Sequence, residues 1–263
     1  MKENKKIIVS AVQLKIKLGD PQGNLIRALK KIEKLAQEGV SLAVLPEMWI
    51  CGYDFKNLEK IADQTPLVLD KLDNIARTYG MTIIGSTVEQ EGSDFFNTAF
   101  TMEGKKGVIG KYRKIHLFPL LREDYYFKRG NRSEVINSSI GKIGVILCFD
   151  IRFPELARSL ALRGAEIVVV PAQWPKVRLN NWRTLLQARA IENQLFVIAS
   201  ACCGEGGKIK LAGHSMIIDP NGKILTEAGE RETVIKAEID LKEIEESRAN
   251  MPCFSGRVPE AYS

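Results

Sequence analysis

Strand-like and helix-like segments alternate along almost the whole of this 263-residue chain. Several segments carry apolar side chains at helical spacing, for example Leu25, Leu29 and Ile32. Between them stand short, β-branched apolar runs that are typical of buried strands. Helices are expected at Asn24–Gln37, Leu67–Tyr79, Pro154–Arg163 and Trp182–Glu192, and strands at Ile7–Leu14, Leu42–Leu45, Met81–Val88, Lys142–Phe149, Glu166–Val170 and Leu195–Ala201. This alternation indicates an α/β fold.

Other predicted strands follow one another too closely for a helix to join them, which indicates antiparallel pairs within the same sheets. They are expected at Thr98–Thr101, Gly107–Arg113, His214–Ile218, Lys223–Leu225 and Thr233–Ile239. No Pro-, Gly- or Ser-rich linker and no internal repeat divides the chain. We therefore expect one domain over residues 1–263, in which residues 250–263 form a C-terminal arm, either on the surface or at an oligomer interface.

The composition excludes several classes of protein. Hydrophobic residues make up 45% and charged residues 27%, as in ordinary globular proteins and unlike disordered or collagen-like chains. The net charge is +6, and the sequence contains no block of five or six like charges, so a nucleic-acid partner is not expected. No apolar run is long enough to span a membrane. The five cysteines are irregularly spaced, which favours reduced thiols and a cytoplasmic location.

Three chemically reactive side chains stand where predicted strands end. Glu47 follows the strand that ends before Pro46, Lys114 follows the strand Gly107–Arg113, and Cys148 lies near the end of an apolar strand. In α/β proteins, functional groups collect in the crevice at the carboxyl ends of strands.

The combination of a thiol, a carboxylate and an ammonium suits hydrolysis through an acyl-enzyme. A thiol attacks well only when it loses its proton, and a carboxylate can accept that proton and later activate water. An ammonium can stabilise both the thiolate and an oxyanion. The alternative, an inert buried cysteine, is common in protein cores.

The segments around these residues resemble the nitrilase (carbon–nitrogen hydrolase) superfamily. They are LPEMWICGYDF, KYRKIHLFP, GVILCFDIRFPELARSLALRGAEIVVVPAQWP and RTLLQARAIENQLFVIAS, and they occur in the order found in the family. The resemblance runs from Ile7 to about Asp240. It implies a four-layer α-β-β-α sandwich that forms a homodimer or a larger homo-oligomer.

The resemblance also implies a role for each reactive residue. Cys148 corresponds to the nucleophile, Glu47 to the general base and Lys114 to the electrostatic partner. The backbone N–H of Phe149 would complete the oxyanion hole with the Lys114 ammonium. Many amidases of the family carry a second glutamate after the lysine motif, for which Glu123 is the candidate. Neither a cofactor nor a metal is expected.

Two residues are candidates for substrate binding. In related carbamoyl-amino-acid hydrolases, an arginine at the position of Arg152 binds the substrate carboxylate, although a salt bridge to Asp150 or Glu155 would also explain it. The segment Pro171–Pro175 resembles that of ω-amidases, which cleave the terminal amide of 2-oxo acids. Trp174 would then line the pocket, unless it is simply a core aromatic.

The remaining candidates are weaker. His116 lies two residues beyond Lys114, so on an extended strand both side chains would point the same way, although structural packing is an equal alternative. His214 is expected at the start of a strand in a structural role. Cys202 and Cys203 are adjacent, a spacing that makes joint binding of one zinc ion difficult.

These observations together predict a cysteine-dependent amidase. Its expected reaction removes ammonia from a small carboxylate-bearing amide, such as 2-oxoglutaramate or 2-oxosuccinamate, through a thioester. An N-carbamoyl amino acid hydrolase and a deaminated-glutathione-type amidase are the alternatives within the family. A catalytically silent binding or assembly subunit is the alternative of another class, but all three reactive positions are occupied.

Overall fold

The strands form one path of hydrogen-bonded neighbours in the order β5-β4-β3-β2-β1-β9-β8-β7-β6. The computed structural model describes residues 6–207 and 209–261 of the chain. Four further strands flank this path: β10 and β11 pair with β9, β12 pairs with β11, and β13 pairs with β1. The strands are β1 (Lys6–Lys15), β2 (Leu42–Val44), β3 (Thr82–Glu91), β4 (Asp94–Glu103), β5 (Gly107–Arg113), β6 (Val135–Ser138), β7 (Gly141–Val145), β8 (Ile167–Ala172), β9 (Phe196–Gly206), β10 (Ile209–Ala212), β11 (Met216–Ile218), β12 (Ile224–Glu227) and β13 (Thr233–Asp240).

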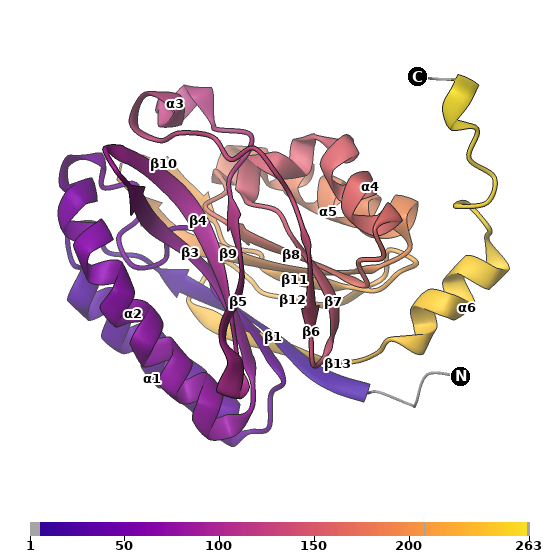
Figure 1. Ribbon diagram of the computed structural model, residues 1–263, viewed down its shortest axis with the longest axis horizontal. Coiled ribbons are helices and arrows are strands. Elements are labelled where there is room, and N and C mark those ends of the chain that lie inside the picture. The colour runs from indigo at the N-terminus through magenta and orange to yellow at the C-terminus, as the bar shows by residue number, and fades with distance from the viewer. Residues whose placement is uncertain (1–5, 208, 262–263) are drawn as a thin grey trace.

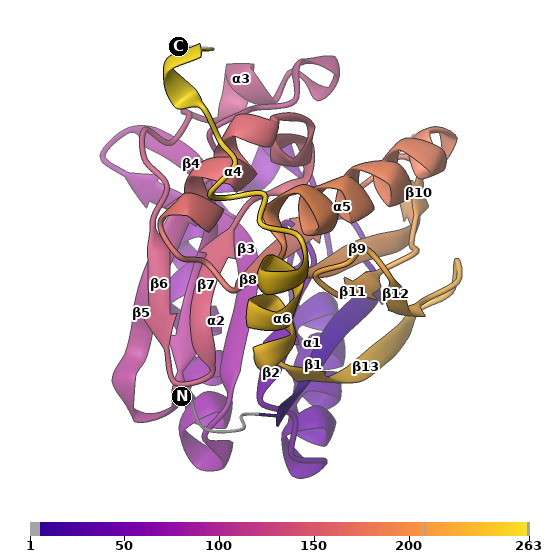
Figure 2. The ribbon, with the colours of Figure 1, turned by 90° about the vertical axis from the view of Figure 1, so that its right-hand side faces the viewer.

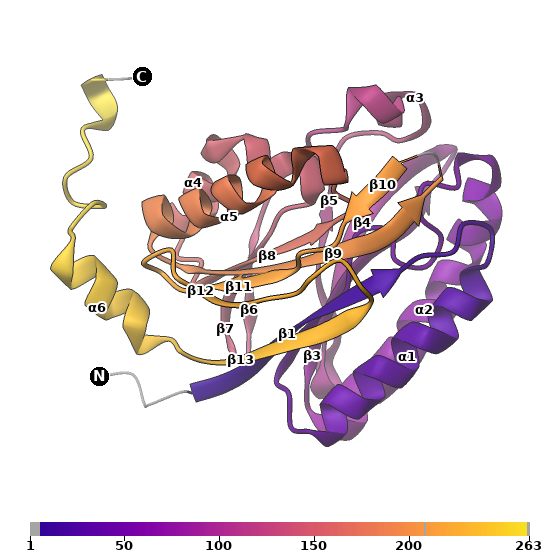
Figure 3. The same cartoon turned by 180° about the vertical axis from the view of Figure 1, so that it is seen from behind.

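The path divides into two sheets where β1 meets β9. Only the pairs Leu14–Cys202 and Lys15–Cys203 join these two strands, whereas β8 and β9 pair along the full length of β8. The inner faces of the two sheets share one apolar core. Helices α1 and α2 cover the outer face of one sheet, and α4 and α5 cover the outer face of the other (Figures 1 and 3). The expected four-layer α-β-β-α sandwich is therefore confirmed.

The pattern of β2 shows how one strand serves two layers. Leu42 and Val44 enter the core between the sheets, while Ala43 and Leu45 pack into the second core beneath α1 and α2. Because side chains alternate along a strand, a short run that is apolar throughout can fill both cores. Glu47 follows directly where this buried run ends.

The first helix begins where the sequence supplies a cap. The first, α1, starts at Pro21, and the Asp20 side chain accepts a hydrogen bond from Gly23 N at 3.0 Å. Proline suits the first helical turn because its missing N–H has no partner to lose there. The helices are α1 (Pro21–Gln37), α2 (Leu58–Tyr79), α3 (Glu123–Tyr126), α4 (Pro154–Leu162), α5 (Leu179–Asn193) and α6 (Lys242–Asn250).

The second helix is longer than the sequence predicts. We expected it to start at Leu67, after Pro66, but α2 begins at Leu58 and includes that proline. The turns before Pro66 carry a buried face formed by Leu58, Ile61 and Thr65. Packing of this face outweighs the hydrogen bond that an interior proline removes from a helix.

The segment around Cys148 also differs from the prediction. We expected a strand over Lys142–Phe149, but β7 ends at Val145. Cys148 opens a 3₁₀ turn over Cys148–Arg152, with its own φ at +45°. A non-glycine residue with positive φ is uncommon, and such backbone strain clusters at functional sites.

The C-terminal segment leaves the layered body after β13. It forms α6 and then runs past α4, as Figure 2 shows in yellow. The Phe254 ring lies under two guanidinium groups, 5.3 Å from that of Arg158 and 4.6 Å from that of Arg248. The expected arm thus has a defined course, and its place at an interface stays a prediction.

Candidate active site

Lys114 lies at the centre of the candidate site, between two buried carboxylates. Its ammonium is 2.8 Å from Glu47 Oε1 and 2.7 Å from Glu123 Oε2, and none of the three side chains is exposed. The Tyr53 hydroxyl is the third neighbour, at 3.3 Å. The structure therefore brings together Glu47, Lys114 and the second glutamate suggested by the sequence.

Local backbone contacts fix Lys114 where β5 ends. Its N–H donates to Asn97 O at 2.9 Å, and its carbonyl accepts from Gly130 N at 2.8 Å. No residue with a side chain fits in place of Gly130, since a Cβ there would lie 2.2 Å from the Arg113 carbonyl oxygen. The glycine thus lets the chain that returns from α3 pass close to this strand end.

Glu123 is held by the loop that contains it. Its Oε2 accepts a hydrogen bond from Phe118 N at 2.7 Å, as well as the bond from Lys114. Arg122, with φ at +53°, turns the chain into the short helix α3. This is how a residue expected in a loop becomes completely buried.

Asn97 of β4 joins the two carboxylates and was not predicted from the sequence. Its Nδ2 donates to Glu47 Oε1 at 2.9 Å and to Glu123 Oε1 at 3.1 Å. A buried amide within an apolar strand is the signal that could have found it, because such groups need hydrogen-bond partners.

Gln173, just after β8, holds Glu47 from the other sheet. Its backbone N–H donates to Glu47 Oε2 at 3.1 Å, and its Nε2 donates to the Glu47 carbonyl at 3.0 Å. The Gln173 carbonyl also accepts from the Cys148 Sγ at 3.7 Å. One residue therefore fixes both the carboxylate and the thiol, although the sequence pointed to its neighbour Trp174.

The Cys148 thiol is protonated in the resting site. Burial raises its pKa well above the usual value, and the Glu47 carboxylate raises it further. The Lys114 ammonium acts in the opposite direction but does not outweigh these effects. The thiol thus needs a base when it reacts, and Glu47 lies close enough to accept the proton.

The ammonium and the second carboxylate affect each other. Burial disfavours the charge on Lys114, but Glu123 and Glu47 outweigh it and raise the pKa of the lysine. Burial raises the pKa of Glu123, while the Lys114 charge opposes this shift. Lys114 is therefore a permanent cation at any ordinary pH.

Asp150 ties the lysine segment to the cysteine turn. Its carboxylate accepts from Leu147 N at 2.9 Å and from the Tyr112 hydroxyl at 2.7 Å. It also accepts from His116 N at 2.9 Å and lies 2.8 Å from His116 Nδ1. One buried side chain thus links the residues that flank Lys114 to those that flank Cys148.

The histidines have structural contacts. His116 faces Asp150 and stacks on Phe153 at 3.6 Å between ring centroids. The extended strand on which His116 would point the same way as Lys114 is not formed, because β5 ends at Arg113, and the alternative of structural packing fits the contacts of His116. His214 pairs with Glu227 at 2.7 Å, and the strand expected from His214 begins two residues later, at Met216.

A small cavity of about 20 Å³ lies directly against Cys148. Two arginines line it, Arg152 and Arg178. The alternative of a salt bridge from Arg152 to Asp150 or Glu155 is not observed among residues 6–207 and 209–261. Instead, burial and the nearby Arg178 charge lower the pKa of Arg152. An anion in this cavity would relieve that repulsion.

Trp174 fits both of its sequence interpretations. It is only 2% exposed and packs on Trp182, with 5.2 Å between the ring centroids. It also lines the cavity beside Cys148, where the Arg152 guanidinium lies 5.0 Å from its ring centroid. Phe149 lines the same cavity. Trp174 therefore supports the orientation of Arg152 as well as the core.

The fold and the motifs define an enzyme that hydrolyses carbon–nitrogen bonds. The chain belongs to the carbon–nitrogen hydrolase family, whose model matches residues 8–249. It is 39% identical to the 2-oxoglutaramate amidase of Bacillus subtilis (strain 168) over 256 residues, which cover 97% of this chain and 98% of the relative.

Solved structures agree with this assignment. Nit3 of Saccharomyces cerevisiae, a member of branch 10 of the nitrilase superfamily, matches with a TM-score of 0.87 and 32% identity over 94% of this chain and 95% of its own. An amidase from Nesterenkonia sp. AN1 matches with a TM-score of 0.83 and 25% identity, over 94% of this chain and 98% of its own. In that amidase, a mutant shows acrylamide added at the active site cysteine.

Among residues 6–207 and 209–261, no group of three or more His, Cys, Asp and Glu side chains is arranged to hold a metal ion. The helices of the same residues are too short or too polar to cross a lipid bilayer.

Proposed function

We propose that the protein is a cysteine-dependent amidase for small substrates that carry a carboxylate, such as 2-oxoglutaramate or 2-oxosuccinamate. The observation that carries this proposal is the place of Lys114, held between Glu47 and Glu123 and close enough to act on the pKa of Cys148. The relative named 2-oxoglutaramate amidase supports an amide as the bond that is cleaved.

In the first half-reaction, the Cys148 thiol gives its proton to Glu47 as the sulfur attacks the amide carbon. The oxyanion that forms is stabilised by the Lys114 ammonium and the Phe149 N–H. Glu47 then protonates the amide nitrogen, the carbon–nitrogen bond breaks and ammonia leaves. The acyl group stays on the sulfur as a thioester.

In the second half-reaction, water attacks the thioester while Glu47 accepts its proton. The carbon–sulfur bond breaks, the carboxylic acid leaves, and Cys148 takes the proton back from Glu47. Glu123 and Asn97 keep Glu47 and Lys114 in place through both halves. The sum is one amide and one water converted into one acid and one ammonia.

The paired arginines supply the selectivity for an anionic acyl group. Arg152 and Arg178 line the cavity beside Cys148. Burial lowers the pKa of Arg152, and repulsion from the Arg178 charge lowers it further. A substrate carboxylate would neutralise this charge and form charge-assisted hydrogen bonds. This cavity is also small, which favours short acyl chains.

The direct test is ammonia release from 2-oxoglutaramate by the purified protein. Cys148→Ala is expected to remove turnover completely while the far-ultraviolet circular dichroism spectrum stays unchanged, because the cysteine supplies the covalent step. Substantial ammonia release by this variant would contradict the mechanism. No release by the wild type from 2-oxoglutaramate, N-carbamoyl amino acids, deaminated glutathione or simple amides would favour the silent subunit.

The role of the arginines has a separate test. Arg152→Ala is expected to raise KM for 2-oxoglutaramate by about 10- to 100-fold, the usual effect of a lost hydrogen bond to a charged group. KM for the neutral amide butanamide is expected to change little. Equal losses for the two substrates would show that Arg152 supports the fold rather than the substrate carboxylate.

A further inference from the structure

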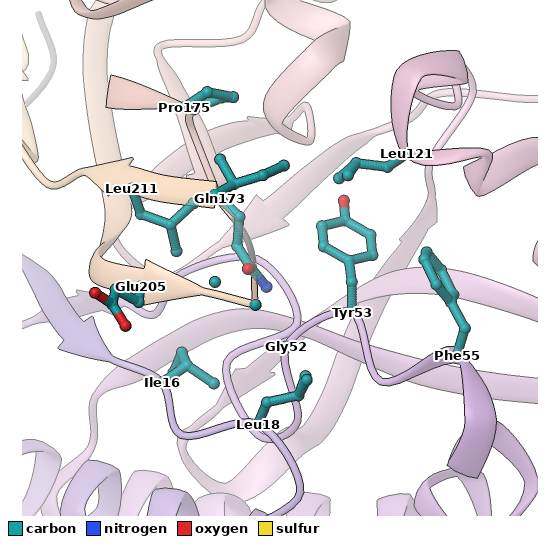
Figure 4. Close-up of a pocket in the computed structure, with 13 residues that line it drawn as sticks. Ile16, Leu18, Gly52, Tyr53, Phe55, Leu121, Gln173, Pro175, Glu205 and Leu211 are labelled. Atoms are coloured by element: carbon teal, nitrogen blue, oxygen red, sulfur yellow. The ribbon is translucent and has the colours of Figure 1, made fainter. Parts of the chain in front are cut away.

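A second cavity of about 180 Å³ lies next to the catalytic one and has no part in the proposed reaction. Its wall is mainly apolar, with Tyr53, Gln173 and Glu205 as its polar side chains, and Figure 4 shows these side chains arranged around an open centre. The apolar lining residues are Ile16, Leu18, Phe55, Leu121, Ile209 and Leu211.

The two cavities are adjacent and share part of their wall. Tyr53, Leu121, Gln173 and Pro175 line both the apolar cavity and the one that holds Cys148. Tyr53 and Gln173 are also the residues that touch the catalytic groups, through Lys114 and Glu47 respectively. A molecule bound at Cys148 could therefore extend past these two side chains into the apolar cavity.

The charges around Cys148 orient such a molecule. Arg152, Arg178 and Trp174 line only the cavity beside the cysteine. A substrate carboxylate therefore belongs on that side, and the acyl chain with it. The amide nitrogen must then face Glu47, the group that protonates it, and Gln173 leads from Glu47 into the apolar cavity.

We propose that the apolar cavity is a subsite for the leaving amine, so that the enzyme also cleaves N-alkyl amides of small dicarboxylic acids. This inference rests on the proposed amidase function. Ammonia has no substituent and would leave the cavity unused. With an N-alkyl amide the same bonds change: sulfur adds to the carbonyl carbon, the carbon–nitrogen bond breaks, and the alkylamine leaves with the proton from Glu47.

The expected gain in affinity follows from burial. Each methylene group that leaves water for an apolar site strengthens binding roughly fourfold. A butyl group is small compared with the cavity, so N-butylsuccinamate is expected to bind at least tenfold more tightly than succinamate. If the butyl group binds in this cavity, a change in a side chain of the cavity wall must reduce this gain in affinity.

The experiment measures binding and turnover separately. Calorimetry with the Cys148→Ala protein gives Kd for succinamate, N-butylsuccinamate and hexanamide, which carries an alkyl chain on the acyl side instead. The same compounds are assayed with the wild-type protein as kcat/KM. The wall is then changed by Leu18→Trp, because Leu18 is 50% exposed at the cavity and a larger ring can enter without disturbing the core.

Leu120→Trp is the matched control, since Leu120 is 68% exposed and does not line the cavity. The ratio of Kd for succinamate to Kd for N-butylsuccinamate is expected to fall at least tenfold in Leu18→Trp and to hold in Leu120→Trp. Equal affinity of the wild-type site for both compounds would overturn the subsite. So would a Leu18→Trp effect confined to hexanamide, because the cavity would then take the acyl chain.

Failure of the amidase proposal would look different. If the compounds bind as expected but the wild-type protein cleaves none of them, the cavity stands as a binding site for the alkyl group, while the amidase function and the cleavage of N-alkyl amides both fail. If succinamate is cleaved but the butyl group does not lower Kd, the amidase proposal stands and the subsite fails.

Discussion

At the scale of single residues, the site depends on an ammonium that cannot lose its proton. Lys114 donates to Glu47 and Glu123, and both carboxylates raise its pKa. A fixed cation can stabilise an oxyanion without a proton transfer of its own. In the proposed mechanism, all of the proton transfers therefore fall to Glu47, which serves both half-reactions.

Glu47→Gln is expected to lower kcat by roughly 1000-fold or more. A general base or acid commonly contributes about 10²–10⁴-fold in each step, and Glu47 would act in both. The amide oxygen can keep the bond from Asn97, and the bond from Gln173 Nε2 to the backbone carbonyl of residue 47 does not involve the side chain, so the fold should persist although the Gln173 N–H loses its acceptor. Mass spectrometry of the protein after mixing with 2-oxoglutaramate tests the balance between steps. An acyl-enzyme adduct on Cys148 is expected if deacylation suffers more, and near-normal turnover would remove Glu47 from the mechanism.

The motifs of the sequence predicted much of this residue-level arrangement. Glu47, Lys114 and Glu123 were singled out from the sequence and lie in contact. Asn97 and Gln173 were not, because their roles depend on which strands become neighbours, and Gln173 acts partly through its backbone N–H. A main-chain donor leaves no mark in a sequence.

At the scale of elements, Asp150 sets the distance between the lysine segment and the cysteine turn. Its four hydrogen-bond partners come from both segments, and the carboxylate is completely buried. From the sequence, Asp150 was expected only as a possible salt-bridge partner of Arg152. The hydrogen bonds by which Asp150 links the two segments could not be predicted, because Tyr112 and His116 are distant from Asp150 along the chain.

Asp150→Asn is expected to destabilise the fold by about 1.5–3 kcal/mol, since an amide leaves some of the buried donors without an acceptor. The loss is measured by urea unfolding. Because Lys114 and the Phe149 N–H would shift relative to each other, kcat should fall more than KM changes. The matched control is Tyr112→Phe, which removes one donor and leaves the carboxylate. An unchanged kcat in Asp150→Asn would show that the bridge has no catalytic consequence.

A second element-level network holds β3, β4 and β5 together. Burial tends to raise the pKa of Glu89 in β3, but hydrogen bonds from Arg113, Lys111 and Thr98 outweigh it and lower this pKa to about 2. A carboxyl whose pKa is lowered in the folded protein stabilises it above the unfolded value, here 4.5. That contribution is lost as the pH falls from 4.5 towards 2.

Glu89→Gln is therefore expected to lower Tm at pH 7 by roughly 2–4 °C, the shift that about 1 kcal/mol produces in a chain of this size. Differential scanning calorimetry at several pH values checks the sign: the gap between wild type and variant should narrow below pH 4.5. Glu91→Gln, which removes a more exposed partner of Arg113, should have the smaller effect. A gap that widens in acid would contradict the proposed pairing.

At the scale of the whole molecule, the layered fold gathers strand ends from two sheets at one edge. Glu47 follows β2 and Lys114 follows β5 in the first sheet, while Cys148 follows β7 and Gln173 follows β8 in the second. The proposed base and the proposed nucleophile thus come from different sheets. Any loss of contact between the sheets should reduce activity before either sheet unfolds.

The C-terminal arm is the part of the molecule that the layers do not explain. Its residues run past α4 (Figure 2), where Phe254 packs against the core, and Met251 is 63% exposed. Contact with another subunit would remove this apolar surface from water. We therefore propose that the arm contributes to a homodimer or a larger homo-oligomer.

Deletion of residues 252–263 is expected to shift the protein from an oligomer towards the monomer in sedimentation velocity runs at micromolar concentration. The deletion keeps the bond from Gln194 Nε2 to the Met251 carbonyl, so α6 should stay in place. Lys71→Asp, which reverses the charge of an exposed side chain of α2, is the control and should leave the mass unchanged. An equal mass for the full and shortened chains over a dilution series would exclude the arm from the interface. If the shortened monomer keeps full kcat/KM, each active site is complete within one chain.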